Sequence, residues 1–248
     1  YKVTEYLVQG TLRSVLRDAS SKLTCSELTN IARDVSAGLA FLNSARIVHR
    51  HIATDSILVK QEGGRAFAKI GHFDFRTARF LERPLRSVCV EEDIVASDRL
   101  RWSAPEVVQT QTYSAASDVY SLGVTVWEIF NRGEEPWGGV AVSEVVKAVL
   151  AGQCVPRTPS TPQFIYEHVI EPCCAREHFS RPSGIEVYNI LRSRVPPETT
   201  SSVSLSFEDM SGGTNTPDYV DVLSAASPSS PWWTSQPDDD IGPNDYAL

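Results

Sequence analysis

The sequence lacks the features of a membrane-spanning or exported protein. Its 248 residues contain no run of eighteen apolar residues, so no membrane-spanning helix is predicted, and the N-terminus has no signal-like pattern. Cysteine is scarce: the five cysteines are odd in number and lack the spacing of metal ligands. We therefore expect free thiols and a reducing compartment.

Basic residues are missing from the last part of the chain. From Pro196 onward there are nine acidic residues and no Lys or Arg, which leaves 23 basic and 22 acidic residues before it. The earlier part is near neutral, so nucleic acid is not an expected partner. The later part is rich in Pro, Ser and Thr and cannot bury enough apolar surface to offset its ordering entropy. We expect a folded domain over residues 1–195 and a disordered acidic tail over residues 196–248.

The apolar pattern of the first part predicts a mainly α (α+β) fold, helical with one small β-hairpin. The chain starts without Met, in a segment (residues 1–8) that has the pattern of mid-strand, so we expect it to be a fragment of a longer protein. Thr24 and Glu27 have the spacing of a capping box, followed by apolar residues at helical intervals. Helices are predicted over residues 11–17, 24–43, 116–130, 143–152, 161–175 and 184–194. Strands at 56–60 and 66–71 are predicted to pair around Gly63 and Gly64, and residues 76–103 are predicted to be irregular.

Six short segments occur in an order that is specific when taken together. They are VTEYLVQGTLRSVLR, VHRHIATDSILV, KIGHFDFRTAR, RWSAPEVV, SDVYSLGVTVWEIFNRGEEPW and SRPSGIEVYNIL. This series resembles the hinge and C-terminal lobe of a protein kinase of the tyrosine-kinase type. Among tyrosine kinases, YSAASDVYS and EIFNRGEEPW are most similar to the ephrin-receptor type.

The resemblance implies a framework of three charged residues. Glu106 is expected to form a buried bidentate ion pair with Arg181, which would hold the end of the activation segment against the last helices. Asp118 is expected to accept backbone N–H groups near His49 and Arg50 and so brace the catalytic loop.

The resemblance also locates the positions that carry the chemistry. In this family a loop Asp takes the proton of the substrate hydroxyl, an Asn five residues on binds a metal ion, and the Asp of Asp-Phe-Gly binds the metal ions against the phosphates. Here the first two positions hold His51 and Ser56. Counting from the strand AKIG gives His72 at the third position, whereas counting back from TAR gives Asp74. Both alternatives remain open, and in either case the Gly of the motif is replaced.

His51, Arg50 and Asp55 are the candidate catalytic residues. An imidazole has a suitable unperturbed pKa of about 6.5 for a general base. It is bulkier than a carboxylate, however, and in its protonated form it would repel metal ions. Asp55, where receptor kinases often have Arg, is the candidate for a displaced carboxylate. We expect an impaired or inactive kinase domain that acts by binding proteins; the alternative is an active tyrosine kinase that uses ATP and Mg²⁺. No Tyr occurs between Phe80 and Ser103, so ordering of the activation segment by phosphotyrosine is not expected.

The sequence contains only part of the nucleotide site that the resemblance implies. Thr4 is the expected gatekeeper, Glu5, Tyr6 and Leu7 form the expected hinge, and Leu58 is the expected adenine contact in the lobe. The glycine-rich loop, its strand lysine and the helix glutamate are expected upstream of Tyr1. If the chain is active, ATP and Mg²⁺ are its cofactors; otherwise it has none.

The tail suggests a second function through protein partners. Phosphorylated Tyr219, in TPDYVDVL, would suit a Src-homology-2 domain. Tyr246 stands two residues before Leu248, and a C-terminal Leu would suit a PDZ groove. The other expected partners are protein substrates or signalling proteins. We expect the domain to lie on the cytoplasmic side of a membrane, attached only through an upstream segment.

Overall fold

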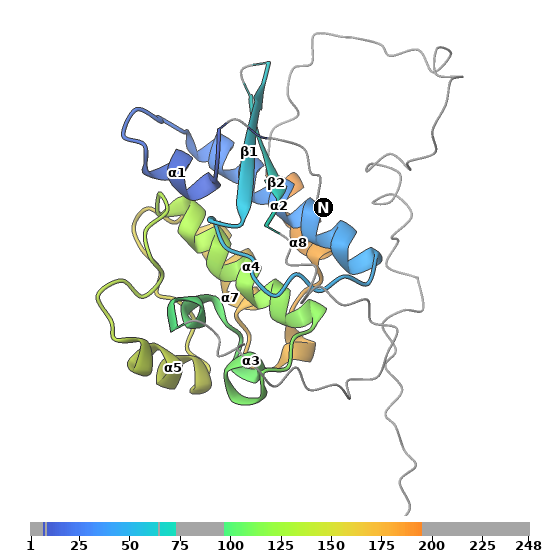
Figure 1. The fold of residues 1–248 in the computed structure, drawn as a ribbon, viewed down its shortest axis with the longest axis vertical. Coiled ribbons are helices and arrows are strands. Elements are labelled where there is room, and N and C mark those ends of the chain that lie inside the picture. Colours follow the sequence, from blue (N-terminus) through green and yellow to red (C-terminus); the bar gives the residue numbers. More distant parts are fainter. Residues whose placement is uncertain (1–6, 8, 64, 73–96, 195–248) are drawn as a thin grey trace, which may run out of the picture.

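The computed structural model describes residues 7, 9–63, 65–72 and 97–194 (Figure 1). The predicted strand over residues 1–8, apart from Leu7, and the predicted tail over residues 196–248 lie outside this part. In chain order the elements are α1 (Leu12–Arg17), α2 (Cys25–Ser44), β1 (Ile57–Glu62), β2 (Arg65–Ile70), a 3-10 helix (Ser97–Trp102), α3 (Pro105–Thr110), α4 (Ala115–Phe130), α5 (Val142–Leu150), α6 (Gln163–Ile165), a π-helical turn (Tyr166–Ile170), α7 (Glu171–Cys173), a 3-10 turn (His178–Ser180) and α8 (Gly184–Arg192). The predicted mainly helical fold with one small hairpin is confirmed.

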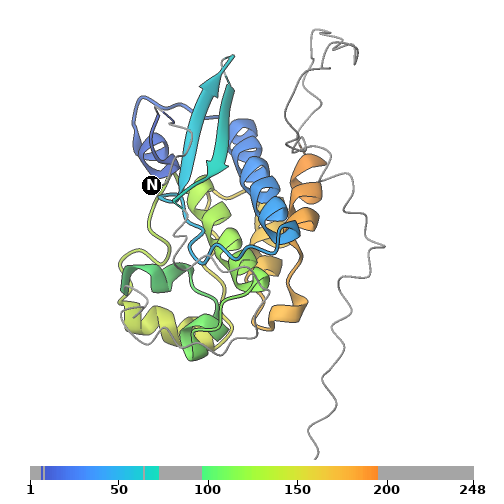
Figure 2. The ribbon, with the colours of Figure 1, turned by 45° about the vertical axis from the view of Figure 1, so that its right-hand side comes forward.

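Helix α4 forms the centre of the fold. All of its residues from Ser117 to Phe130 are buried, and Figure 2 shows it running through the middle of the molecule with α2 beside it. A helix that is buried on all sides needs mostly apolar residues all round, and the segment VYSLGVTVWEIF supplies them. Its polar residues Ser121, Thr125 and Glu128 are hydrogen-bonded inside the protein. Helix α2 packs on both α4 and α8, and its predicted capping box of Thr24 and Glu27 is present.

The hairpin stands at one end of this helical core (Figure 1). Strands β1 and β2 pair antiparallel, with Ile57 opposite Ile70 and Glu62 opposite Arg65. Gly63 in the turn has φ +59°, a left-handed conformation that favours glycine. The prediction of this hairpin is confirmed, and its pairing fixes the position of the loop that precedes β1.

The prediction of one helix over residues 161–175 is wrong in detail. The segment is divided into α6, the π-helical turn and α7, and the Glu171 N–H donates to Tyr166 O, five residues back. Pro172 has no N–H and cannot continue an α-helical hydrogen-bond pattern. The proline therefore coincides with the change in helix type.

The irregular structure predicted for residues 76–103 is wrong at its end, because Ser97–Trp102 is a 3-10 helix. Its buried Arg101 donates to the carbonyls of Pro136 at 3.2 Å, Trp137 at 3.0 Å and Val140 at 2.8 Å. These bonds hold the short helix against the loop between α4 and α5.

Two further expectations concern membranes and cysteines. Within the described ranges no helix combines the length and the apolar character needed to cross a bilayer. Cys25, Cys154, Cys173 and Cys174 are free thiols, which confirms that prediction for four of the five cysteines.

Candidate functional site

The loop before β1 is held from below by Asp118, in the first turn of α4. The Asp118 carboxylate accepts the His49 N–H at 2.6 Å and the Arg50 N–H at 2.8 Å, so the predicted brace is present. Burial raises the pKa of Asp118 to about 7, against these two donors, which favour the charged form. Arg50 has φ +70°, a costly conformation for a residue with a Cβ, and its guanidinium lies 5.1 Å from the ring centre of Tyr113. The brace therefore fixes the backbone just before His51.

His49 connects this loop to the end of β2. Its Nε2 lies 2.9 Å from Gly71 O, and its Nδ1 lies 3.3 Å from the backbone nitrogen of His51. A carbonyl requires a donor at Nε2 and an N–H requires an acceptor at Nδ1, so this geometry selects the neutral Nε2–H tautomer. Burial lowers the pKa of His49 to about 4, which keeps the ring neutral.

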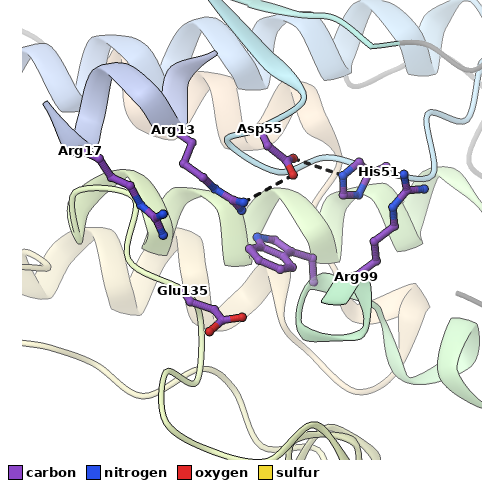
Figure 3. A pocket seen from close by; sticks show the side chains of 7 residues that line it. Arg13, Arg17, His51, Asp55, Arg99 and Glu135 are labelled. Atoms are coloured by element: carbon purple, nitrogen blue, oxygen red, sulfur yellow. Dashed lines mark ion pairs between the residues drawn. The ribbon is translucent and has the colours of Figure 1, made fainter. Parts of the chain in front are cut away.

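His51 faces Asp55, four residues along the loop (Figure 3). The His51 Nε2 lies 3.2 Å from Asp55 Oδ1, and Arg13 Nη1 lies 3.6 Å from Asp55 Oδ2. Contact with His51 is the main cause of the lowered pKa of Asp55, with burial opposing it and the charges of Arg13 and Arg99 adding to it. The loop thus presents an imidazole paired with an ionised carboxylate.

Ser56, at the position of the metal-binding Asn, turns its hydroxyl into the protein. The hydroxyl donates to Ala53 O at 2.9 Å and accepts the Ala53 N–H at 3.1 Å, and the residue is buried. This hydroxyl therefore closes the turn that leads into β1, and no oxygen of the Ser56 side chain faces solvent.

His72 follows β2 directly. The Gly71 N–H donates to Ser56 O at 2.9 Å and so extends the strand ladder, and the His72 Nδ1 lies 2.9 Å from Asp55 O. Counted from this strand, His72 is the residue beside the catalytic loop. The competing residue Asp74 lies outside the described residues.

The metal-binding positions that are described do not fit Mg²⁺. This ion takes oxygen ligands in a near-octahedral arrangement, whereas Ser56 is turned away and His72 offers nitrogen. Nowhere in the described part of the chain do three His, Cys, Asp or Glu side chains form a group that could hold a metal ion.

The predicted ion pair between Glu106 and Arg181 is present. Arg181 Nη1 donates to Glu106 Oε1 at 2.6 Å and Nη2 donates to Oε2 at 2.9 Å. The remaining donors of the guanidinium bind the carbonyls of Ala175 at 2.8 Å, Ala116 at 3.0 Å and Arg176 at 3.1 Å. The Arg181 side chain is 0% exposed, so its charge depends on Glu106 for compensation.

The remaining nucleotide and tail predictions can be compared only in part. Leu7 and Leu58 are half-buried, and Leu58 makes an isolated β-bridge with Thr11. The other predicted residues lie outside the described residues: Thr4, Glu5, Tyr6, Tyr219, Tyr246 and Leu248.

Glu128 was not predicted as a site residue, although it organises this region. Its side chain is 0% exposed. Arg13 Nε and Nη2 donate to Oε1 at 3.1 Å, and the Thr54 N–H and Trp102 Nε1–H donate to Oε2 at 3.1 Å. Burial raises the pKa of Glu128, while the hydrogen bonds from Thr54 and the charge and hydrogen bonds of Arg13 oppose the shift. The sequence did contain a signal for this residue, which is a single acidic residue within the apolar run VTVWEIF. Such a run predicts burial, and a buried acid requires hydrogen-bond or charge partners.

Arg13, His51, Asp55 and Trp102 also line a cavity of about 470 Å³, together with Arg17, Arg99 and Glu135 (Figure 3). The sequence predicted only the two loop residues among these. The others come from α1, the 3-10 helix and the loop after α4, which no local pattern brings together.

A family model described as protein tyrosine and serine/threonine kinase matches residues 1–191. The chain therefore belongs to this kinase family, and it is of the tyrosine-kinase type. Within the type it is ephrin-receptor-like: ephrin type-A receptor 5 of Homo sapiens is 31% identical over 189 residues, which cover 76% of this chain and 18% of the relative. Ephrin type-A receptor 8 of Mus musculus is 31% identical over 206 residues, 82% of this chain and 20% of the relative. Ephrin type-A receptor 4-A of Xenopus laevis is 28% identical over 232 residues, 94% of this chain and 22% of the relative.

Proposed function

We propose that the chain is a tyrosine-kinase-type signalling domain with impaired catalysis that acts by binding other proteins. Protein kinases as a family use ATP and Mg²⁺. The proposal rests on the residues at the three positions that bind the metal ions and take the proton in this family. His51 stands in place of the catalytic Asp, and the hydroxyl of Ser56, in place of the metal-binding Asn, is hydrogen-bonded to Ala53. His72 lies beside the loop, where the Asp of Asp-Phe-Gly is expected. The framework of Asp118, Glu106 and Arg181 is kept while the groups that would handle metal and proton are changed.

The second candidate is an active tyrosine kinase, and one contact favours it. His51 lies 3.2 Å from Asp55, and an imidazole oriented by a carboxylate is a common general base. In this alternative the pair would accept the proton of a tyrosine hydroxyl in place of a single Asp.

A phosphotransfer assay separates the two candidates. It uses a two-lobed protein that includes the upstream segment expected from the resemblance, with ATP, Mg²⁺ and a tyrosine peptide. We expect negligible transfer by the wild type and no further loss in Asp55→Asn. Robust wild-type transfer at low enzyme concentration that Asp55→Asn abolishes would reject impaired catalysis and support the His51–Asp55 pair as the base.

We infer further that the chain is the cytoplasmic signalling part of a receptor, because the relatives named above are receptors. Protein substrates or signalling proteins are then its partners. A tail that carries phosphorylated Tyr219 would recruit Src-homology-2 proteins. A pull-down in which Tyr219→Phe loses no partner would reject that role, and removal of Leu248 tests the PDZ interaction in the same way.

A further inference from the structure

Three of the four cysteines in the described part of the chain gather beside α4. Cys173 and Cys174 lie at the end of α7, which packs on α4. Cys154 follows α5 and packs against the same apolar core. A Cβ on Gly123 of α4 would lie 2.6 Å from Cys173 Cβ and 3.3 Å from Cys174 Sγ. The proposed function makes no use of these thiols.

The segments that carry Cys154 and Cys174 lie next to each other. The side chain of Arg176 covers Gly152, and a Cβ on Gly152 would lie 3.5 Å from Arg176 Cβ. A disulfide needs about 3.5–4.5 Å between its two Cβ atoms, so the segments approach closely enough for one. Two residues further into each segment, Gly152 leads to Cys154 and Arg176 leads back to Cys174. A hydrogen bond joins the thiols of Cys154 and Cys174, so their sulfur atoms are neighbours.

Two side chains hold the backbone that follows Cys154. The Tyr166 hydroxyl donates to Val155 O at 2.9 Å, and the Trp127 indole N–H donates to Pro156 O at 2.7 Å. The first bond comes from the π-helical turn before α7 and the second comes from α4. Together they keep Cys154 beside the end of α7.

The thiols differ in their access to solvent. Cys154 is half-buried, whereas Cys174 is 3% exposed and Cys173 is 0% exposed. The hydrogen bond with Cys154, together with burial, raises the pKa of Cys174, and burial raises the pKa of Cys173. A small oxidant from solvent therefore reaches Cys154 first, and Cys174 is the protonated thiol that lies next to it.

We propose that Cys154 and Cys174 form a reversible disulfide when hydrogen peroxide reaches the domain. The Cys154 thiolate attacks one oxygen of the peroxide, which breaks the O–O bond, releases hydroxide and leaves a sulfenic acid at Cys154. The Cys174 sulfur then attacks the Cys154 sulfur, and the sulfenic oxygen leaves with the Cys174 proton as water. The two thiols give up two electrons, which reduce the peroxide. A dithiol restores both thiols by exchange.

The disulfide joins the loop after α5 to the segment that binds Arg181. The carbonyls of Ala175 and Arg176, directly after Cys174, accept from the Arg181 guanidinium at 2.8 Å and 3.1 Å. Oxidation therefore strengthens the part of the domain that holds the Glu106–Arg181 ion pair, because a covalent link closes a loop in the unfolded chain. This inference goes beyond the proposed function and does not rest on it, since no residue of the catalytic loop takes part.

Peptide mapping of the 248-residue chain tests the proposal. The reduced chain is treated with a small excess of hydrogen peroxide, its remaining thiols are blocked with N-ethylmaleimide in denaturant, and tryptic peptides are analysed by mass spectrometry without reduction. Cys154 lies in the peptide AVLAGQCVPR and Cys174 lies in TPSTPQFIYEHVIEPCCAR. We expect these two peptides to be linked in the main disulfide product, with the N-ethylmaleimide on Cys173. Dithiothreitol should separate them.

Substitutions and thermal melting provide the controls. Cys154→Ser and Cys174→Ser should each lose the linked pair, whereas the matched control Cys173→Ser should keep it. Melting of the reduced variants shows whether each is folded. Peroxide should raise the melting temperature of the wild type by about 5 °C or more and should not raise that of Cys154→Ser.

Four results would each overturn the proposal. They are the absence of the linked pair from the folded, oxidised chain, a main link to Cys25 instead, an N-ethylmaleimide label on Cys174 in place of Cys173, and an equal rise in the melting temperature of the wild type and Cys154→Ser.

Discussion

The ion pair between Glu106 and Arg181 allows a quantitative prediction of the stability lost when one partner is changed. Glu106→Gln keeps the shape of the side chain and removes its charge. One amide oxygen can still accept from Arg181, but the amide NH₂ would then face the second guanidinium nitrogen, which was 2.9 Å from Glu106 Oε2. The Arg181 side chain is 0% exposed, whereas that of Glu106 is 22% exposed, so water can replace only part of the lost carboxylate.

Removal of one partner from a buried pair costs about 3–5 kcal/mol. Three backbone carbonyls still bind Arg181, so we place the loss for Glu106→Gln near the lower end, at about 3 kcal/mol. This is a large share of the roughly 5–15 kcal/mol that stabilises a typical protein.

Urea unfolding measures this loss as a change in the free energy of unfolding. The matched control is Glu144→Gln, which removes an exposed partner of Lys147 at 2.8 Å and should cost about 0.5 kcal/mol or less. In a double-mutant cycle with Arg181→Met, we expect a coupling of about 2 kcal/mol. If Glu106→Gln is no more destabilising than Glu144→Gln, the pair does not hold the activation segment to the last helices.

Two further predictions concern the core. The pKa of His49 falls from 6.5 to about 4 on folding, so between these two pH values the unfolded chain binds a proton that the folded chain does not. The free energy of unfolding should therefore decrease as the pH is lowered from 6.5 to 4. We expect this decrease to be about 3 kcal/mol larger in the wild type than in His49→Gln. The raised pKa of Asp118 acts in the opposite direction, but it is common to the wild type and His49→Gln. Equal dependence of the free energy of unfolding on pH in the two proteins would refute the burial of a neutral His49. In α4, a Cβ on Gly123 would lie 2.6 Å from Cys173 Cβ, so Gly123→Ala should lower the free energy of unfolding by about 1–3 kcal/mol, whereas a loose interface would give the stabilisation expected of alanine in a helix.

Local signals were sufficient to predict several elements. Thr24 and Glu27 mark the start of α2 by their own spacing, and Gly63 marks the hairpin turn. Helices α1 and α3 are both six residues long. The apolar residues of α1 recur at helical intervals, so it was predicted, whereas α3 has only the adjacent Val107 and Val108 and was missed. The change to π-helical geometry at residues 166–170 depends on packing around Pro172 that the sequence pattern does not express.

The site was predictable only where the family resemblance supplied long-range information. Glu106 and Arg181 lie 75 residues apart, and no local pattern pairs them. The residue type at Ser56 was visible, but its hydroxyl direction depends on the turn around Ala53. Glu128 and Arg13, 115 residues apart, were missed because a buried charge network is defined by three-dimensional contacts.

The central claim is that the framework residues Asp118, Glu106 and Arg181 of a kinase are present, whereas the residues at the positions that bind metal ions and accept the substrate proton differ from those of the family. The most direct test compares the phosphotransfer rate of the two-lobed wild type with that of a variant carrying His51→Asp, Ser56→Asn and His72→Asp together. We predict that the restored variant is faster by at least about a hundredfold, the lower range of general-base catalysis. A wild-type rate equal to or higher than that of the restored variant would contradict the account.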